Sequence, residues 1–150
     1  MGQVTRTKFG IAKIVLIPNA SVITLPTSDV ELVAGRAGWV WLPQHVSLAL
    51  IPRVADYTNI DGAVTLTIRL ANAANVTLTN AFTPATVLAG ADNARFIQQS
   101  TVGLVSDDFT LLSGAALNLH CTNAAAGNFT GGNAGNILRC TVFYSAIKLP

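Results

Sequence analysis

The stretch from Val30 to Pro52, VELVAGRAGWVWLPQHVSLALIP, constrains the fold more than any other part of the sequence. Apolar residues alternate along it in two runs, which predicts two β-strands. Gly35 and Gly38 lie just before the first run, and this spacing favours a tight turn because glycine takes positive φ at little cost. Pro43 cannot donate a hydrogen bond to a neighbouring strand, so we expect a joint between the two runs there.

The first of these predicted strands is apolar on both faces. Trp39 and Trp41 share one face, and Val40 and Leu42 share the other. A strand of this kind is normally covered on both sides. We therefore expect the two indoles to fill a core or a subunit interface. The alternative is that they form a platform on which sugar rings stack.

The same alternation recurs along the rest of the chain. It is clearest in Val64–Leu70 and Ile137–Ile147, where apolar side chains occupy every second position. Shorter strands are predicted at residues 11–17, 22–25, 30–33, 76–79, 95–98, 109–112 and 117–121, with turns between them. No convincing amphipathic helix is visible. This spacing predicts an all-β, antiparallel sandwich, jelly-roll-like, or a barrel, with little or no helix.

Length and composition suggest one domain that associates with other proteins. The chain has 150 residues, of which residues 1–10 are expected to form an N-terminal arm and residues 11–150 a single β-sandwich domain. Hydrophobic residues make up 51% of the chain and charged residues only 11%, against about 25% charged in an average globular protein. We expect part of this apolar surface to be covered in a subunit interface or a larger assembly.

The two cysteines permit a geometric prediction. The segments around Cys121 and Cys140 are consecutive predicted strands, so we expect them to form a hairpin. If Leu119 pairs with Val142, Cys121 lies directly opposite Cys140 on the apolar face. Such a geometry permits a disulfide, but in a reducing compartment we expect two buried free thiols.

Charge and hydropathy argue against nucleic-acid and membrane partners. The net charge is +2, and the basic residues are scattered, whereas nucleic-acid binding calls for a basic patch. The apolar runs are far shorter than the ~20 residues of a membrane-spanning helix. Residues 9–17 are apolar but are interrupted by Lys13 and lack a cleavage site, so we expect an intracellular origin.

No pattern in the sequence predicts catalysis, a cofactor or a metal site. His120 and Cys121 point to opposite faces of one predicted strand, and His45 has no partner at ligand spacing. Asp56 and Asp61 lie in one polar loop, and residues 107–108 are adjacent acids in a predicted turn. We expect these four carboxylates to form hydrogen bonds in turns and at the ends of elements. A glycosidase would instead need two carboxyl groups that face each other. The glycine-rich loop at 127–135 leads into a strand and not into a helix that could hold phosphate.

Two segments together carry a resemblance to a known family. The first is a Val-Glu-Leu-Val strand, a Gly-x-x-Gly turn and an aromatic strand that closes in Leu-Pro, all within residues 30–43. The second is Thr-Gly-Gly-Asn-Ala-Gly-Asn-Ile-Leu-Arg-Cys-Thr-Val-Phe-Tyr at residues 130–144. Over residues 22–147 the chain resembles tailed-bacteriophage virion structural proteins of the capsid decoration or cement type. It departs from them in having Trp39 and Trp41 where smaller residues are usual.

The resemblance implies a non-enzymatic function on the virus particle. It implies a subunit that binds and stabilises the mature capsid lattice, with the major capsid protein and its own copies in a homotrimer as partners. Such a protein is made in the cytoplasm of the bacterial host and sits on the capsid exterior. We expect Arg6, Lys8 and Phe9 of the arm to contact the capsid. The alternative is a glycan-binding module of a head fibre or tail, which would use Trp39 and Trp41.

Overall fold

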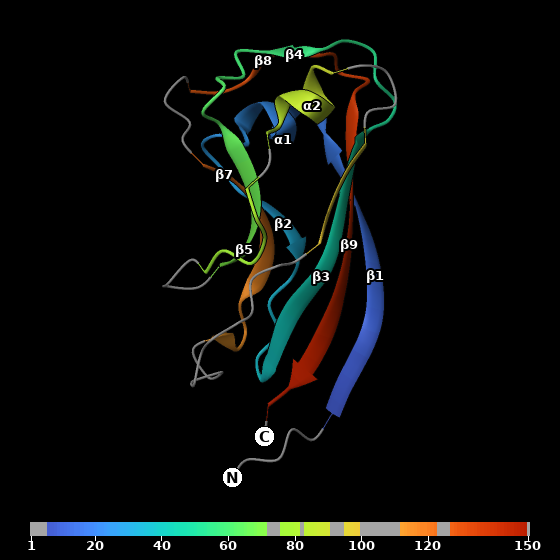
Figure 1. Cartoon of the computed structure of the whole chain (residues 1–150), viewed down its shortest axis with the longest axis vertical. Helices are drawn as coiled ribbons and strands as arrows, with labels where there is room; N and C mark the ends of the chain where they lie inside the picture. The colour runs from blue at the N-terminus through green and yellow to red at the C-terminus, as the bar shows by residue number, and fades with distance from the viewer. Residues whose placement is uncertain are drawn as a thin grey trace.

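The computed structural model describes residues 6–71, 76–81, 83–90, 95–99, 112–122 and 127–149. They form two antiparallel β-sheets that face each other (Figure 1). The larger one, which we call sheet A, has four strands in the order β1 (Arg6–Pro18), β9 (Ile137–Lys148), β3 (Trp39–Leu50) and β6 (Arg95–Gln99). Because β9 and β3 are long and lie in its centre, sheet A forms a continuous wall along the molecule.

The second sheet, sheet B, is smaller. Its strands are β2 (Val30–Val33), β7 (Ala116–Thr122) and β5 (Thr65–Ala71), in that order. Thr77 extends it through a single bridge to Arg69 of β5. A third, two-stranded sheet of β4 (Tyr57–Thr58) and β8 (Thr130–Gly131) lies at one end of the molecule, together with the short helices α1 (Asn19–Thr24) and α2 (Ala85–Leu88) (Figure 1).

The order of the strands identifies the topology. Followed along the chain, β1, β2, β3, β5, β6, β7 and β9 alternate between sheet A and sheet B. With the Thr77 bridge placed beside β5, each sheet has the strand neighbours of a jelly roll. The expected all-β antiparallel sandwich is therefore confirmed, and the jelly-roll alternative is the one that the chain adopts.

The core lies between the two sheets and is built by the predicted alternation. In β9, Leu138, Cys140 and Val142 are fully buried, and in β7, Leu117 and Leu119 are fully buried as well. Each such aliphatic side chain contributes roughly 1.5–3 kcal/mol when it leaves water. The strands predicted at Val64–Leu70 and Ile137–Ile147 are confirmed as β5 and β9, with small differences at their ends.

The predicted cysteine hairpin is wrong. Cys121 pairs with Leu66 in sheet B, while Cys140 pairs with Val15 and Leu48 in sheet A. In this jelly roll β7 belongs to sheet B and β9 to sheet A, so these two segments do not pair with each other although they lie close in sequence. Both cysteines are buried free thiols, as expected.

The strand predicted at residues 22–25 is also wrong, because α1 occupies this segment. A helix turn places Val22 and Leu25 on one side, and both are buried. The hydroxyl of Thr24 donates to the carbonyl of Ala20 one turn earlier. The short apolar run is compatible with the two-residue period of a strand and with the 3.6-residue period of a helix. The helix is favoured because it buries Val22 and Leu25 at the end of the sandwich.

The two strands predicted in Val30–Pro52 after the glycine turn are one strand, β3. Pro43 marks a shift of register against β9, between Pro43 and His45, instead of a break. The turn before it is confirmed, with Gly38 at a φ of +76°. The strand predicted from Ile11 begins earlier, at Arg6, so residues 6–10 of the expected arm belong to the strand that pairs with β9.

Several predicted segments have other outcomes. The strand near residues 95–98 is confirmed as β6, whereas residues 76–79 form only one bridge, and α2 was not predicted. The turn at 106–108 and most of the strand at 109–112 lie outside the described residues. Within the described part of the chain, no helix is long and apolar enough to cross a membrane.

Candidate interaction surface

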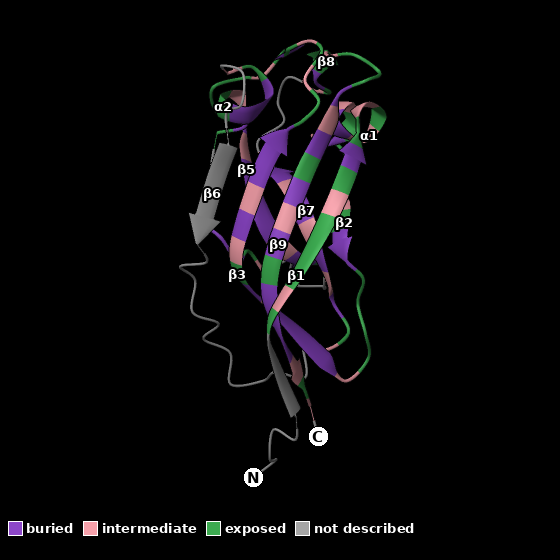
Figure 2. Cartoon of the chain, turned by 90° about the vertical axis from the view of Figure 1, so that its right-hand side faces the viewer, coloured by how far each residue is buried: buried purple, intermediate pink, exposed green. Residues whose placement is uncertain are grey.

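The side of sheet A that faces away from sheet B is unusually apolar. We call it the outer face of sheet A and define it by the side chains that alternate with the buried ones in three adjacent strands: Ala12, Ile14 and Leu16 of β1, Arg139, Thr141 and Phe143 of β9, and His45, Ser47, Ala49 and Ile51 in and just after β3. Figure 2 shows exposed residues along β1 and at intervals along β9 on this side of the molecule.

The large apolar side chains of this face are open to solvent. Leu16 is 60% exposed, Ile14 51%, Ile51 39% and Phe143 37%. They account for four of the five exposed large hydrophobic residues in the described part of the chain, and Val54 is the fifth. Isolated apolar residues are ordinary on a protein surface, but a contiguous group on one sheet face is typical of an interaction site.

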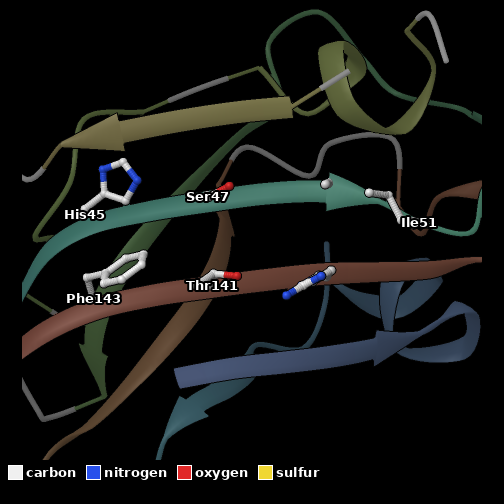
Figure 3. A pocket seen from close by; sticks show the side chains of 7 residues that line it. His45, Ser47, Ile51, Thr141 and Phe143 are labelled. Atoms are coloured by element: carbon white, nitrogen blue, oxygen red, sulfur yellow. The ribbon is translucent and has the colours of Figure 1, made fainter. Parts of the chain in front are cut away.

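A shallow hollow of about 310 Å³ lies in the middle of this face (Figure 3). Its wall at one end is made by His45 and Phe143, whose rings meet edge to face with centroids 5.4 Å apart. Ser47 and Thr141 lie side by side on β3 and β9 and carry hydroxyl groups along the hollow (Figure 3). Ile51 lies at the other end (Figure 3).

Arg139 supplies the charge in the hollow. It is exposed, and it stands across the sheet between Leu16 of β1 and Ala49 of β3. No hydrogen bond or ion pair joins its guanidinium to another described residue. As far as the described residues show, the hollow therefore combines a cation without an ion-pair partner, two hydroxyl groups and apolar neighbours.

The free edge of sheet A carries features that discourage strand addition. Among the described strands β1 pairs only with β9, so its other side is an open edge there. Lys13 is exposed on the face opposite to Ile14, and the register shifts between Lys8 and Ile11, where Gly10 has a φ of +68°. An inward-directed lysine and a bulge both weaken edge-to-edge pairing. These features make the broad face a better candidate for a partner surface than the edge of β1.

The outer face of sheet B has the opposite character. Asp29, just before β2, accepts hydrogen bonds from Arg69 and Asn118 and is 2.8 Å from Nδ1 of His120. Burial raises the pKa of the Asp29 carboxyl, but its bonds to His120 and Arg69 outweigh this and lower the pKa below the ordinary value. These groups pair through the Asp29 carboxylate, although the Oδ1 of Asn118 and the hydroxyl of Thr67 on the same face are buried without a hydrogen-bond partner among the described residues.

Trp39 and Trp41, the expected interface or sugar-stacking residues, lie inside the sandwich. They are 8% and 7% exposed and stack on each other with ring centroids 6.1 Å apart. Trp41 also donates from Nε1 to the carbonyl of Ala34 and meets the ring of Tyr144 edge to face. The burial of both indoles within one chain argues against an open platform for sugar rings.

Arg6, Lys8 and Phe9, the expected capsid-contacting residues, all lie in the first part of β1. Their backbone runs along the far end of β9, with Arg6 opposite Lys148 and Lys8 opposite Ala146. Their side chains lie outside the described part of the structure. The hollow around Arg139 is in the other half of sheet A, so the structure does not bring these residues to it.

The candidate nucleophiles are poorly placed for chemistry. Burial raises the pKa of the Cys140 thiol to about 12, and burial together with the charge of Asp29 raises the pKa of the Cys121 thiol to about 11. Both thiols are therefore protonated near neutral pH. Among the residues that the structure describes, no group of three or more His, Cys, Asp or Glu side chains could hold a metal ion.

Sequence reasoning missed the residues of the outer face, although a signal for them was present. Residues 11–17, IAKIVLI, are apolar on both faces of the strand. That pattern normally indicates a strand covered on both sides. Here the covering on one side is absent from the described chain, which leaves Ile14 and Leu16 exposed.

Comparisons with known proteins give distant structural similarities only. No protein-family model matches the chain, and neither does any curated protein. A chain of the Ralstonia phage GP4 capsid is 15% identical with a TM-score of 0.44, and the match covers 95% of this chain and 85% of that one. A chain of the cyanophage Pam1 capsid is also 15% identical, with a TM-score of 0.46 and coverages of 96% and 85%. A chain of Mud crab tombus-like virus is 7% identical with a TM-score of 0.32, covering 100% and 82%. Similarities this distant carry no functional argument, so the outer face of sheet A is the feature from which a function must be inferred.

Proposed function

We propose that this chain is a non-enzymatic structural subunit of a bacteriophage virion, of the capsid decoration or cement type. The observation that carries the proposal is the outer face of sheet A, with four exposed large apolar side chains around a shallow hollow. The phage setting comes from the sequence resemblance of residues 22–147. In this role the chain docks on the major capsid protein from the exterior of the particle, as a homotrimer.

The physical basis of cement action is differential binding. A subunit that contacts several capsid proteins only in the mature lattice stabilises that lattice by its free energy of binding. A broad, apolar, weakly charged face suits this task, because such a surface gains free energy when water is removed from it. Jelly rolls occur both as capsid domains and as lectins. The fold is therefore compatible with the decoration role but does not distinguish it from glycan binding.

Two observations favour a structural role over an enzymatic one. The hollow contains His45 and Ser47, but among the described residues no carboxylate lines it to orient the imidazole. Both thiols are buried and protonated near neutral pH. A binding surface uses the groups in the hollow more fully than a reaction would.

The glycan-binding alternative meets a specific obstacle. It requires Trp39 and Trp41 to present ring faces to a sugar, and both indoles are packed inside the sandwich. An addition of host glycans is therefore expected to leave the tryptophan fluorescence unchanged. A saturable change in that fluorescence would favour the alternative.

The proposal is tested by binding to shells of the phage that encodes the chain. Purified chain is mixed with mature shells lacking it and with immature shells, and bound protein is measured after sedimentation. We expect saturable binding to mature shells and a higher temperature of shell disruption when the chain is bound. Leu16→Asp is expected to weaken binding by roughly tenfold or more, because it places a charge in the contact.

The matched control for this experiment is a change on the other sheet. Glu31 is exposed on β2, so Glu31→Lys alters the charge without touching the outer face of sheet A. We expect this variant to bind as the unmodified chain does. Absence of binding by the unmodified chain to either type of shell would overturn the proposed function.

A further inference from the structure

We propose that the hollow around Arg139 receives a carboxylate from the partner protein, presented by a side chain flanked by apolar residues. This inference rests on the proposed function in taking the outer face of sheet A as the docking face. It goes further by stating the chemistry of the partner at one position. The partner is a protein surface with an aspartate or glutamate set among aliphatic or aromatic side chains.

Charge is distributed unevenly over the strands. None of the seven acidic residues of the chain falls in the four strands of sheet A. Six of the nine Lys and Arg residues do fall there: Arg6, Lys8, Lys13, Arg95, Arg139 and Lys148. A sheet with cations and no anions attracts an acidic partner and repels a basic one.

Arg139 lies on the outer face of sheet A at a position where its positive charge favours an anionic partner. Its neighbours across the sheet are Leu16 and Ala49, so its guanidinium emerges from apolar surroundings. Within the described part of the chain no carboxylate satisfies it. When a partner covers the face, an unpaired guanidinium there would lose its water without compensation. A carboxylate from the partner restores the lost interactions and can accept two parallel hydrogen bonds from arginine.

Hydroxyl groups beside Arg139 add to the attraction for an anion. Ser47 and Thr141 are neighbours on β3 and β9, and both line the same hollow as Arg139. A hydroxyl donates readily to a carboxylate oxygen. The hollow thus offers one cation and two hydroxyl donors, all suited to an anion.

A second copy of this chain is a weaker candidate for the same site. If two copies met through this face around a two-fold axis, the face would be paired with itself. Such a dimer would bring together two faces that each carry the Arg139 cation and, in the strands of sheet A, no carboxylate to pair with it. An acidic sugar is also disfavoured, because none of the described residues that line the hollow has a carboxylate or side-chain amide to bind its hydroxyl groups.

The first experiment measures how tightly Arg139→Gln and Arg139→Glu bind mature shells that lack the chain. We expect a loss of affinity of roughly tenfold or more for Arg139→Glu and a smaller loss for Arg139→Gln. Lys13→Gln is the matched control, because Lys13 belongs to the same sheet but projects from its other face. If the unmodified chain binds shells and both Arg139 variants bind equally well, the inference is wrong.

A second experiment tests the site without any capsid, so the two proposals can fail separately. Hexanoate, which joins a carboxylate to an apolar chain, is titrated into the protein while the NMR signals of Ile51 and Phe143 are followed. Hexylammonium, with the opposite charge, is the control probe. We expect saturable shifts with hexanoate, several times those with hexylammonium, and their loss in Arg139→Gln.

The outcomes of the two experiments distinguish a failure of the proposed function from a failure of the anion site. If the unmodified chain fails to bind shells, the proposed function falls and the hexanoate titration alone decides the inference. Equal shifts from both probes, in that case, would refute the anion site. If Arg139→Glu changes the mass of the chain in solution, the occupant is a second copy, and a separate capsid partner for this hollow is ruled out.

Discussion

At the scale of single residues, Asp29 organises the polar outer face of sheet B. Its carboxylate joins three strands by contacting Arg69 of β5 and His120 and Asn118 of β7 from a position just before β2. Hydrogen bonds to a charged group contribute more than neutral ones, although solvent reduces the value at a partly open site. We therefore expect Asp29 to stabilise sheet B.

The pKa of Asp29 gives this expectation a pH dependence. The pKa of its carboxyl is lower in the folded chain than the ordinary value of 3.8. The carboxylate therefore stabilises the fold fully above that ordinary value, and the contribution is lost as the pH falls through the folded-state pKa. Asp29→Asn should lower the free energy of unfolding by about 1 kcal/mol at pH 7. Urea unfolding at pH 7 and at pH 3 measures the difference, which should shrink at the lower pH.

Glu31→Gln is the control for this measurement. Glu31 is exposed on β2 next to Asp29 and makes no ion pair to a described residue, so its removal should change stability little at either pH. If Asp29→Asn had the same free energy of unfolding as the original chain at pH 7, the hydrogen bonds of Asp29 would not contribute to stability.

The two glycines before β3 show what sequence could and could not predict about a residue. Their spacing predicted a tight turn, and Gly38 indeed has a φ of +76°. Gly35 is needed for another reason: a Cβ there would lie 2.0 Å from the carbonyl oxygen of Gly114. That contact joins residues far apart in sequence, so no local pattern contains it. The position of Arg139 between Leu16 and Ala49 was hidden for the same reason.

At the scale of elements, β1 combines an open edge with an open face. Lys13 is the charged group on the side of β1 that turns toward sheet B. We expect Lys13→Val to change the free energy of unfolding by no more than about 0.5 kcal/mol, because the residue is exposed. It should nevertheless increase self-association through the edge, since a charge that blocks strand addition is lost.

Sedimentation velocity over a range of concentrations measures this effect. Lys13→Arg is the control and should sediment as the unmodified chain does, because it keeps the charge. Larger species in Lys13→Val alone would support the protective role of Lys13. Equal sedimentation of all three proteins would assign the protection of the edge to the register shift near Gly10.

Strand periodicity predicted most elements because it depends on burial of one face. β5, β7 and β9 follow the alternation of apolar residues closely. Pairing of strands is a long-range property, so the hairpin of Cys121 and Cys140 was a natural but wrong inference from sequence order. The helix α1 was missed because six residues are too few to separate the two periods.

At the scale of the whole molecule, the two outer faces of the sandwich have different roles. Sheet B presents a polar network centred on Asp29, whereas sheet A presents exposed apolar residues and Arg139, which has no ion-pair partner among the described residues. This asymmetry is the basis for proposing that the partner binds the outer face of sheet A. If the chain is a homotrimer, its subunit contacts should lie away from the outer face of sheet A, so that this face stays open for the capsid.

Light scattering on the purified chain tests this arrangement directly. We expect the mass of three copies of the 15.6 kDa chain. The same mass is expected for Leu16→Asp, because that side chain lies on the face proposed to bind the capsid. A trimer that dissociates in Leu16→Asp would place the subunit interface on the outer face of sheet A and remove the face from capsid docking. A monomer would contradict the homotrimer and leave the exposed apolar face to be covered only on the particle.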